Sequence, residues 1–120
     1  MKGMSFAALQ QVSAYFQALS EPTRLQILNL LRDGERNVGT LAKLCSCTAA
    51  NVSRHLSMLV QQGLVERESR GTAVYYRIAD PSVYALCDLV CGRIERRLAD
   101  VARARRTFAN RARSTPARGR

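Results

Sequence analysis

Two neighbouring segments near the middle of the chain repeat their apolar residues at helical spacing. In the segment from Val38 to Leu44, Leu41 and Leu44 lie three residues apart and so share one face of a helix. The next segment, Thr48 to Gln62, forms one apolar stripe from Val52, Leu56, Leu59 and Val60. Thr48 can cap this second helix by accepting a hydrogen bond from a free backbone N–H, and Gly63 ends it. The pattern predicts two helices joined by a tight turn.

Three further helices are predicted around this pair. The first runs from Met4 to Leu19 and is apolar along one stripe. The second begins with Ser20 as its N-cap and with a proline in its first turn. Asp80-Pro81 starts a last long helix by the same combination of cap and proline, and we expect this helix to run to about Ala104.

The two helices joined by a tight turn form a helix-turn-helix. Between this helix-turn-helix and the last helix, apolar and polar residues alternate with the period of a β-strand. Val65 lies before the sequence Ser69-Arg70-Gly71-Thr72, and Val74, Tyr76 and Ile78 follow it. This pattern predicts a β-hairpin with a basic, glycine-containing tip. A helix-turn-helix followed directly by a hairpin is a winged helix, so the expected fold is mainly α, with five helices and a small β-hairpin as the wing.

Two apolar stripes are not needed for the core of such a domain. One lies on the first helix, and the other runs along the last helix through Cys87, Val90, Cys91, Ile94, Leu98 and Val101. The three middle helices and the wing already supply a core, and exposed apolar surface on this scale usually marks an interface. We therefore expect a homodimer that packs through its first and last helices.

The outer face of the predicted second helix of the pair is small, hydrogen-bonding and basic. Opposite the apolar stripe it carries Ala50, Asn51, Arg54 and Ser57, with Ser53 beside them. No acidic residue occurs from Leu41 to Val65. Small residues allow close approach to a DNA major groove, in which Asn and Arg can read base edges. We expect Arg67 and Arg70 of the wing to contact DNA phosphates or the DNA minor groove.

Charge is unevenly distributed along the 120 residues. The formal net charge is +10, and residues 103–120 hold seven arginines and no acid. A basic balance favours a polyanionic partner. We expect one domain over residues 1–104 and a basic, disordered tail over residues 105–120, because the tail has little to bury. The tail either binds DNA phosphates loosely or only keeps the protein soluble, and the sequence favours neither.

Several classes of protein find little support. No apolar run approaches the ~20 residues of a membrane helix, and the N-terminus lacks a signal-peptide pattern, so we expect a cytoplasmic protein with reduced thiols. The chain has no glycine-rich phosphate loop and no Ser/His/Asp set, and its one histidine is His55, which argues against an enzyme. A winged helix that binds protein instead of DNA would lack the basic groove-facing surface that Arg54 and the wing supply.

The cysteines are candidate ligands for a metal or metalloid ion, or candidate redox-active residues. Cys87 and Cys91 lie four residues apart on one helical face, so both thiolates could reach one ion, and thiolates select soft ions such as Zn, Cd, Pb, Cu(I) or trivalent arsenic. The alternative is that both only fill the interface stripe. Cys45 and Cys47 lie in the turn before the helix predicted from Thr48 to Gln62, which we call the recognition helix. A thiol near the N-terminus of a helix has a lowered pKa, which would suit a redox switch or a second pair of ligands. A small residue tolerated in a turn is the alternative there.

Taken together, three sequences resemble the ArsR/SmtB family of bacterial winged-helix repressors. They are the segment from Ala18 to Leu28, the segment from Asn51 to Leu56, and the wing with Gly71 and Tyr75-Tyr76-Arg77. The resemblance implies a homodimer that binds operator DNA and releases it when an inducer binds, often a thiophilic metal or metalloid. By the family pattern, the DNA-contacting positions correspond to Thr48, Ala49, Asn51, Ser53, Arg54 and His55. His55 also lies close to the apolar stripe, so a half-buried histidine is an equal alternative. Thr72 joins Arg67 and Arg70 as a wing contact.

The sensing residues depart from the family pattern. Arsenic-sensing members carry Cys-x-Cys near the start of the first helix of the pair, where this chain has Asn37-Val38-Gly39. Zinc-sensing members carry Asp and His pairs on the last helix, where this chain offers Cys87 and Cys91. The inducer is therefore expected to be arsenite, Cd, Pb or Zn bound by Cys87 and Cys91, with Cys45 and Cys47 as the second choice. The alternatives are a repressor switched by thiol oxidation or persulfidation, and one without cysteine-based sensing.

Overall fold

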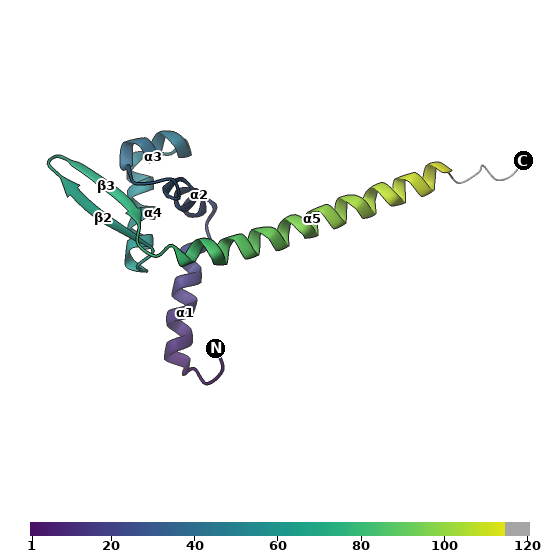
Figure 1. Cartoon of the computed structure of the whole chain (residues 1–120), viewed down its shortest axis with the longest axis horizontal. Helices are drawn as coiled ribbons and strands as arrows, with labels where there is room; N and C mark the ends of the chain where they lie inside the picture. The colour runs from purple at the N-terminus through teal and green to yellow at the C-terminus, as the bar shows by residue number, and fades with distance from the viewer. Residues whose placement is uncertain (115–120) are drawn as a thin grey trace, which may run out of the picture. The chain divides into compact units, whose positions relative to one another are not determined.

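The computed structural model describes residues 1–114, in two compact units that divide after Pro81. Its elements are labelled in Figure 1. The first unit contains α1 (Phe6–Leu19), α2 (Pro22–Leu31), β1 (Arg36–Asn37), α3 (Val38–Cys45), α4 (Ala49–Gln61), β2 (Val65–Arg70) and β3 (Ala73–Ile78). The second unit contains α5 (Ser82–Ser114). Five helices and a small antiparallel sheet confirm the predicted winged helix-turn-helix.

The junction between α1 and α2 differs by one residue from the prediction. Glu21 is the N-cap of α2, and its carboxylate accepts a hydrogen bond from the backbone N–H of Arg24 at 2.9 Å. Ser20, which was expected in that role, instead ends α1, where its Oγ donates to the carbonyl of Gln17 at 2.9 Å. Both residue types suit a helix end, so composition alone did not decide between them.

The wing is part of a three-stranded sheet with the order β1-β3-β2. Strands β2 and β3 pair antiparallel from Val65 opposite Ile78 to Arg70 opposite Ala73. Gly71, with φ of +62°, supplies the left-handed residue of the turn between them. The prediction missed β1, whose two residues pair with Tyr75 and Tyr76 of β3, because two residues are too few for an alternating pattern.

The core of the first unit lies between α2, α3, α4 and the base of the sheet. Its fully buried side chains include Ile27, Leu31, Leu41, Leu56, Leu59, Leu64 and Val65. Two residues of the predicted stripes lie outside it: Leu44 is 47% exposed and Val60 is 37% exposed. Each lies at the margin of the apolar stripe of its helix, so the buried faces of α3 and α4 are narrower than the sequence pattern indicated.

Helix α5 runs from Ser82 to Ser114 and begins directly after Asp80-Pro81, as expected. Its C-terminal end was placed wrongly at about Ala104, because residues 105–114 continue the helix. Alanine and arginine are strong helix formers, which gives this extension a local cause. The rest of the predicted tail, residues 115–120, lies outside the described residues. None of the helices within residues 1–114 has the length and apolar composition to cross a bilayer.

Candidate nucleic-acid interface

A tight turn sets the start of α4. Ser46 has left-handed backbone angles, with φ of 54°, and ends α3. Thr48 then caps α4, because its Oγ1 accepts a hydrogen bond from the backbone N–H of Asn51 at 3.1 Å. At the other end Gly63, with φ of +72°, stops the helix. The predicted cap and stop are both confirmed.

The outer face of α4 consists of the residues that the sequence assigned to it. Thr48, Ala49, Ala50, Arg54 and Ser57 are exposed, and Asn51 and Ser53 are half-buried. Arg54 Nη2 donates to Asn51 Oδ1 at 2.6 Å, which holds the guanidinium beside the amide. Ser57 Oγ donates to the carbonyl oxygen of Ser53 at 3.0 Å. Two groups able to read base edges therefore lie side by side on a surface without acids.

His55 does not belong to this surface. It is 6% exposed, its Nδ1 lies 3.2 Å from Arg24 Nη1, and its Nε2 lies 3.8 Å from Glu21 Oε2. Of the two alternatives for this residue, the structure supports burial. The assignment of His55 to DNA contact was wrong, because the ring is enclosed with the first turn of α2 and is not available to a groove.

Arg24 is a buried cation that the sequence analysis missed. It is 8% exposed, and its Nε and Nη2 donate to the carbonyl oxygens of Ala18 and Gln17 at 2.7 and 3.0 Å. Its Nη1 also contacts Met58 Sδ at 3.3 Å, in addition to His55. One guanidinium therefore connects the last turn of α1 to α4. The available signal was a single charged residue within the helical segment Pro22–Leu31.

Glu21 completes this group. Burial disfavours the charged form of its carboxylate, but the backbone N–H of Arg24 and the nearby His55 favour it, and the net effect is a pKa lowered from 4.5. The ionised carboxylate lies at the N-terminus of α2, where the helix dipole also favours a negative charge. Glu21, Arg24 and His55 are below called the α1–α4 link.

The arginine at the wing tip is held by acids. Arg70 Nη1 and Nη2 donate to the two carboxylate oxygens of Glu35 at 2.6 and 2.8 Å, and Nη2 also donates to Glu68 at 2.8 Å. The same guanidinium lies 4.8 Å from the ring centroid of Tyr75. These hydrogen bonds raise the pKa of Arg70 and lower that of Glu68. The acids Glu35 and Glu68 therefore neutralise this arginine, and a DNA contact of Arg70 stays a prediction.

Arg67 differs from the other two arginines of the wing. Arg77 donates to Glu66 and Glu68, each at 2.6 Å, so it is neutralised like Arg70. Arg67 is exposed and makes no ion pair within residues 1–114. It lines an open hollow of about 510 Å³ between α4 and the wing, together with Ser53, Ser57, Val60, Gln61 and Tyr76. Thr72 is exposed at the tip beside Gly71.

The four cysteines form no disulfide and lie in two pairs along the chain. Cys87 is half-buried and Cys91 is exposed, one helical turn apart on α5. Residues 1–114 contain no group of three or more His, Cys, Asp or Glu side chains that could hold a metal ion. A site with more than the two sulfurs of α5 would therefore need ligands from a second copy of the chain.

The second pair lies in the turn before α4. Cys47 Sγ donates to the carbonyl oxygen of Cys45 at 3.3 Å, and both residues are half-buried. Burial raises the pKa of the Cys45 thiol, and the neighbouring Cys47 raises it further. The expectation of a lowered pKa in this turn was wrong for Cys45, because burial disfavours its thiolate.

Known proteins resemble both the sequence and the fold. Residues 21–67 match the family described as "Bacterial regulatory protein, arsR family". The HTH-type transcriptional regulator Rv0324 of Mycobacterium tuberculosis is 43% identical over 96 residues, which are 80% of this chain. That alignment spans only 42% of Rv0324, so the relative is much longer than the shared region.

Solved structures match over most of their own length. The homodimeric winged helix-turn-helix domain of Mb0332 from Mycobacterium bovis, described as a possible ArsR-family transcriptional regulator, has a TM-score of 0.69 and 40% identity, and covers 82% of this chain and 94% of its own. The AntR antimony-specific transcriptional repressor has a TM-score of 0.70 and 28% identity, and covers 82% of this chain and 90% of its own.

Proposed function

The chain belongs to the ArsR family of bacterial DNA-binding regulators, which are not enzymes, and we propose that it is a homodimeric transcriptional repressor. In this proposal it acts in the cytoplasm, binds double-stranded operator DNA through α4 and the wing, and releases the DNA when a thiophilic metal or metalloid ion binds its cysteines.

The outer face of α4 carries the proposal of sequence-specific binding. Asn51 and Arg54 present amide and guanidinium groups side by side, and both can make paired hydrogen bonds with base edges in a major groove. Thr48, Ala49, Ala50, Ser53 and Ser57 keep the rest of the face small. Arg67 lies beside this face in the hollow next to the wing, where a cation would meet a backbone phosphate.

Exposed apolar side chains support the dimer. On α1, Phe6 is 75% exposed and Phe16 49% exposed. Along α5, Val90, Ile94, Leu98 and Val101 are all exposed. Side chains of this size on two helices of one chain favour burial against a second copy, and the domain of Mb0332 is homodimeric. A dimer would present two α4 helices to half-sites about one DNA turn apart.

Cys87 and Cys91 are the proposed inducer ligands. Their spacing places both thiols on the apolar stripe of α5, so in a dimer that buries this stripe the partner's copies could supply additional sulfurs. Soft thiolates favour Cd, Pb, Zn or trivalent arsenic over hard cations, and AntR is named as an antimony-specific repressor. The bound ion would supply a bridge between thiolates that fixes one arrangement of the helices.

The α1–α4 link offers a physical route from the dimer interface to the recognition helix. Arg24 binds the carbonyls of Gln17 and Ala18 in the last turn of α1 and touches His55 and Met58 of α4, so a shift of α1 cannot leave α4 unaffected without breaking these hydrogen bonds. An inducer changes operator affinity only as far as it binds one arrangement better than the other. Coupling of this kind is typically worth about 1–3 kcal/mol.

One binding experiment tests the proposal as a whole. The protein is titrated into a labelled duplex from upstream of its own gene and into a scrambled duplex of equal length, alone and with arsenite, Cd, Pb, Zn or a thiol oxidant. We expect tighter binding to the upstream duplex and release by at least one of the ions. Equal affinity for both duplexes would reject sequence-specific repression, and release by an oxidant but by none of the ions would favour the redox alternative through Cys45 or Cys47.

A further inference from the structure

The C-terminal part of α5 is a cationic helix that the proposed operator contacts do not use. Residues 101–113 contain Arg103, Arg105, Arg106, Arg111 and Arg113 and no acid, and all five side chains are exposed. The earlier part of the same helix is balanced, because Arg93, Arg96 and Arg97 alternate with Asp88, Glu95 and Asp100. The charge is therefore a property of one segment of α5, which we call the arginine segment (residues 101–113).

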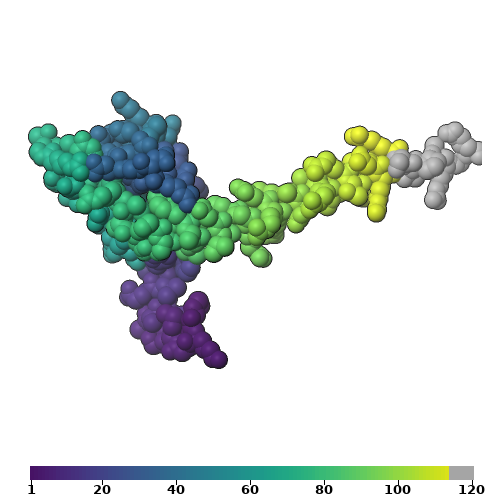
Figure 2. Space-filling model, viewed as in Figure 1, coloured from purple at the N-terminus to yellow at the C-terminus, as the bar shows by residue number. Residues whose placement is uncertain are grey.

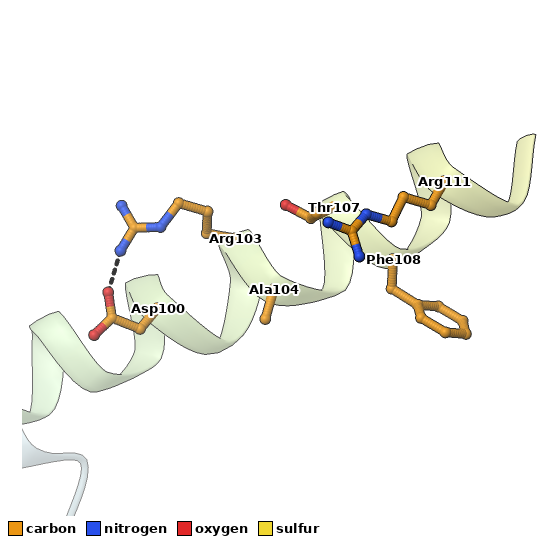
Figure 3. A pocket seen from close by; sticks show the side chains of 6 residues that line it. All are labelled: Asp100, Arg103, Ala104, Thr107, Phe108 and Arg111. Carbon is orange, nitrogen blue, oxygen red and sulfur yellow. Dashed lines mark hydrogen bonds and ion pairs between the residues drawn. The ribbon is translucent and has the colours of Figure 1, made fainter. Parts of the chain in front are cut away.

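The arginines of this segment do not surround the helix evenly. At 3.6 residues per turn, Arg103 falls opposite the apolar stripe, Arg106 and Arg111 fall on its two flanks, and Arg105 falls within the stripe. In Figure 3, Arg103 projects to one side of α5 and Phe108 to the other, and the guanidinium of Arg111 lies along the helix between them. Asp100 pairs with Arg103, at the border of the segment. A dimer that buries the stripe would thus leave an arginine face open.

Arg103 to Arg113 span about 15 Å of helix, since each residue adds about 1.5 Å, and no acid lies between them. Asp100 offsets the charge of Arg103, and the other four arginines repel one another. Arg111 and Arg113 in the last turn gain from the helix dipole, but Arg103, Arg105 and Arg106 lie too far from the end to share that gain. A polyanion bound along the segment would remove this repulsion. Guanidinium groups bind phosphate through two parallel hydrogen bonds, which makes arginine well suited to such a partner.

The side chains opposite the arginine face decide which polyanion fits. A basic helix that lies on a membrane needs bulky apolar residues on its other face. Beyond Val101 the arginine segment offers only Phe108, with Ala104, Ala109 and Ala112 beside it, and this is little to insert into lipid. Figure 2 shows the yellow end of α5 as a narrow rod from which separate groups of atoms project. The composition favours a polyanion in water over a membrane surface.

We propose that the arginine segment of α5 is a second, sequence-independent DNA-binding surface that contacts backbone phosphates through Arg103, Arg106 and Arg111. The identification of DNA as the polyanion rests on the proposed function. The surface adds affinity for any duplex, and α4 supplies the preference for the operator. The segment contains no group placed in the sensing or sequence-reading machinery.

The test compares two charge-matched variants of the full chain. Arg103, Arg106 and Arg111 are changed to Gln in one, and Arg93, Arg96 and Arg97 in the other, so that each loses three positive charges from α5. Dissociation constants are measured on the upstream duplex and on a scrambled duplex of equal length, both long enough to extend beyond the half-sites, over a series of salt concentrations. Circular dichroism checks that both variants keep the helix content of the parent protein.

We expect the arginine-segment variant to bind both duplexes more weakly by the same factor. Its slope of log affinity against log salt should fall by roughly 0.9 for each phosphate that the variant no longer neutralises. The matched variant should keep most of the parent's slope. Equal changes in the two variants would mean that only net charge matters, and no change in either would mean that the segment does not touch DNA; both results overturn the proposal.

Two further results separate this inference from the proposed function. A parent protein without any preference for the upstream duplex would reject specific repression but leave the slope comparison valid. Binding of the parent to vesicles of phosphatidylglycerol and phosphatidylcholine, lost in the arginine-segment variant while its DNA slope is unchanged, would assign the segment to a membrane surface and overturn DNA binding by it.

Discussion

Arg24 Nη1 lies 3.2 Å from His55 Nδ1, inside a unit where both side chains are more than nine-tenths buried. The pair joins the first turn of α2 to the recognition helix, and the same guanidinium holds the end of α1. A charged residue in such a position is retained only when its donors are satisfied, because a buried unpaired charge is costly. The histidine of the recognition helix is therefore a structural residue.

Replacing Arg24 by Ala should lower the free energy of unfolding by about 1.5–3 kcal/mol, since the carbonyls of Gln17 and Ala18 lose a charged donor. His55→Gln should cost less, because the amide oxygen can still accept from Arg24. Urea denaturation followed by circular dichroism measures both changes. Lys43→Ala is the control: this exposed residue should change stability by no more than about 0.5 kcal/mol. Equal stability of the Arg24 variant and the parent protein would contradict the assignment.

Arg54→Ala should weaken operator binding by about 1–3 kcal/mol and relax the preference at one base pair, if Arg54 makes a bidentate base contact. Arg54→Lys keeps the positive charge that Arg54→Ala removes, but it lacks the planar pair of donors. Compared with Arg54→Ala, it should therefore regain more affinity for a scrambled duplex than for the operator. Competition binding with single-base variants of the operator measures the preference. An unchanged affinity and an unchanged preference would remove Arg54 from the reading residues.

The two exposed wing arginines should behave differently. Arg67→Ala should weaken all duplexes alike and reduce the salt slope by roughly 0.9, because Arg67 makes no ion pair in the described part of the chain. Arg70→Ala, predicted from the sequence to have the same effect, should have a smaller one, since a phosphate must compete with Glu35 and Glu68. Salt titrations of both variants on one duplex make the comparison. A larger effect of Arg70→Ala would show that the acids release it on binding.

Acidification should loosen the wing before it unfolds the domain. The hydrogen bonds from Arg70 and Arg77 lower the pKa of Glu68 below its ordinary 4.5, so the stabilisation that they provide is present above that value and is lost as the pH falls through the lowered pKa. The protection of amides in β2 and β3 against hydrogen exchange should then fall below about pH 4.5 more than the protection of amides in α2 does. In Glu68→Gln this step should disappear from the pH profile. An equal loss of protection in the wing and in α2 at the same pH would contradict this prediction.

Cys87→Ser and Cys91→Ser should each leave operator affinity unchanged and abolish release by arsenite, Cd or Pb, because a pair that has lost one sulfur cannot chelate. The same binding titration with and without each ion measures this effect. Cys45→Ser and Cys47→Ser serve as matched controls and should still release the operator. If the pattern were reversed, the sensing site would lie in the turn before α4.

Local signals in the sequence were sufficient for most of the fold. Periodicity and caps located the helices, and Thr48 and Gly63 fixed both ends of α4, because each of these features involves residues within one or two turns. The surface of α4 followed from the same periodicity. What local patterns could not supply was the pairing of distant segments. His55 seemed available to DNA until Arg24, 31 residues earlier, was found beside it, and Arg70 seemed free until Glu35, 35 residues earlier, was found to bind it.

The same separation along the chain has a consequence for how the protein folds. The hairpin β2–β3 joins near neighbours and can form within about 1–10 μs, whereas Arg36 must find Tyr76 across about 40 residues, at an entropic cost of loop closure that is met before the pairing stabilises anything. We therefore expect β1 to join the sheet late, after the helix-turn-helix has brought its ends together. During synthesis β1 leaves the ribosome well before its partner strand, so the Glu35–Arg70 ion pair should be among the last interactions of the nascent chain to form.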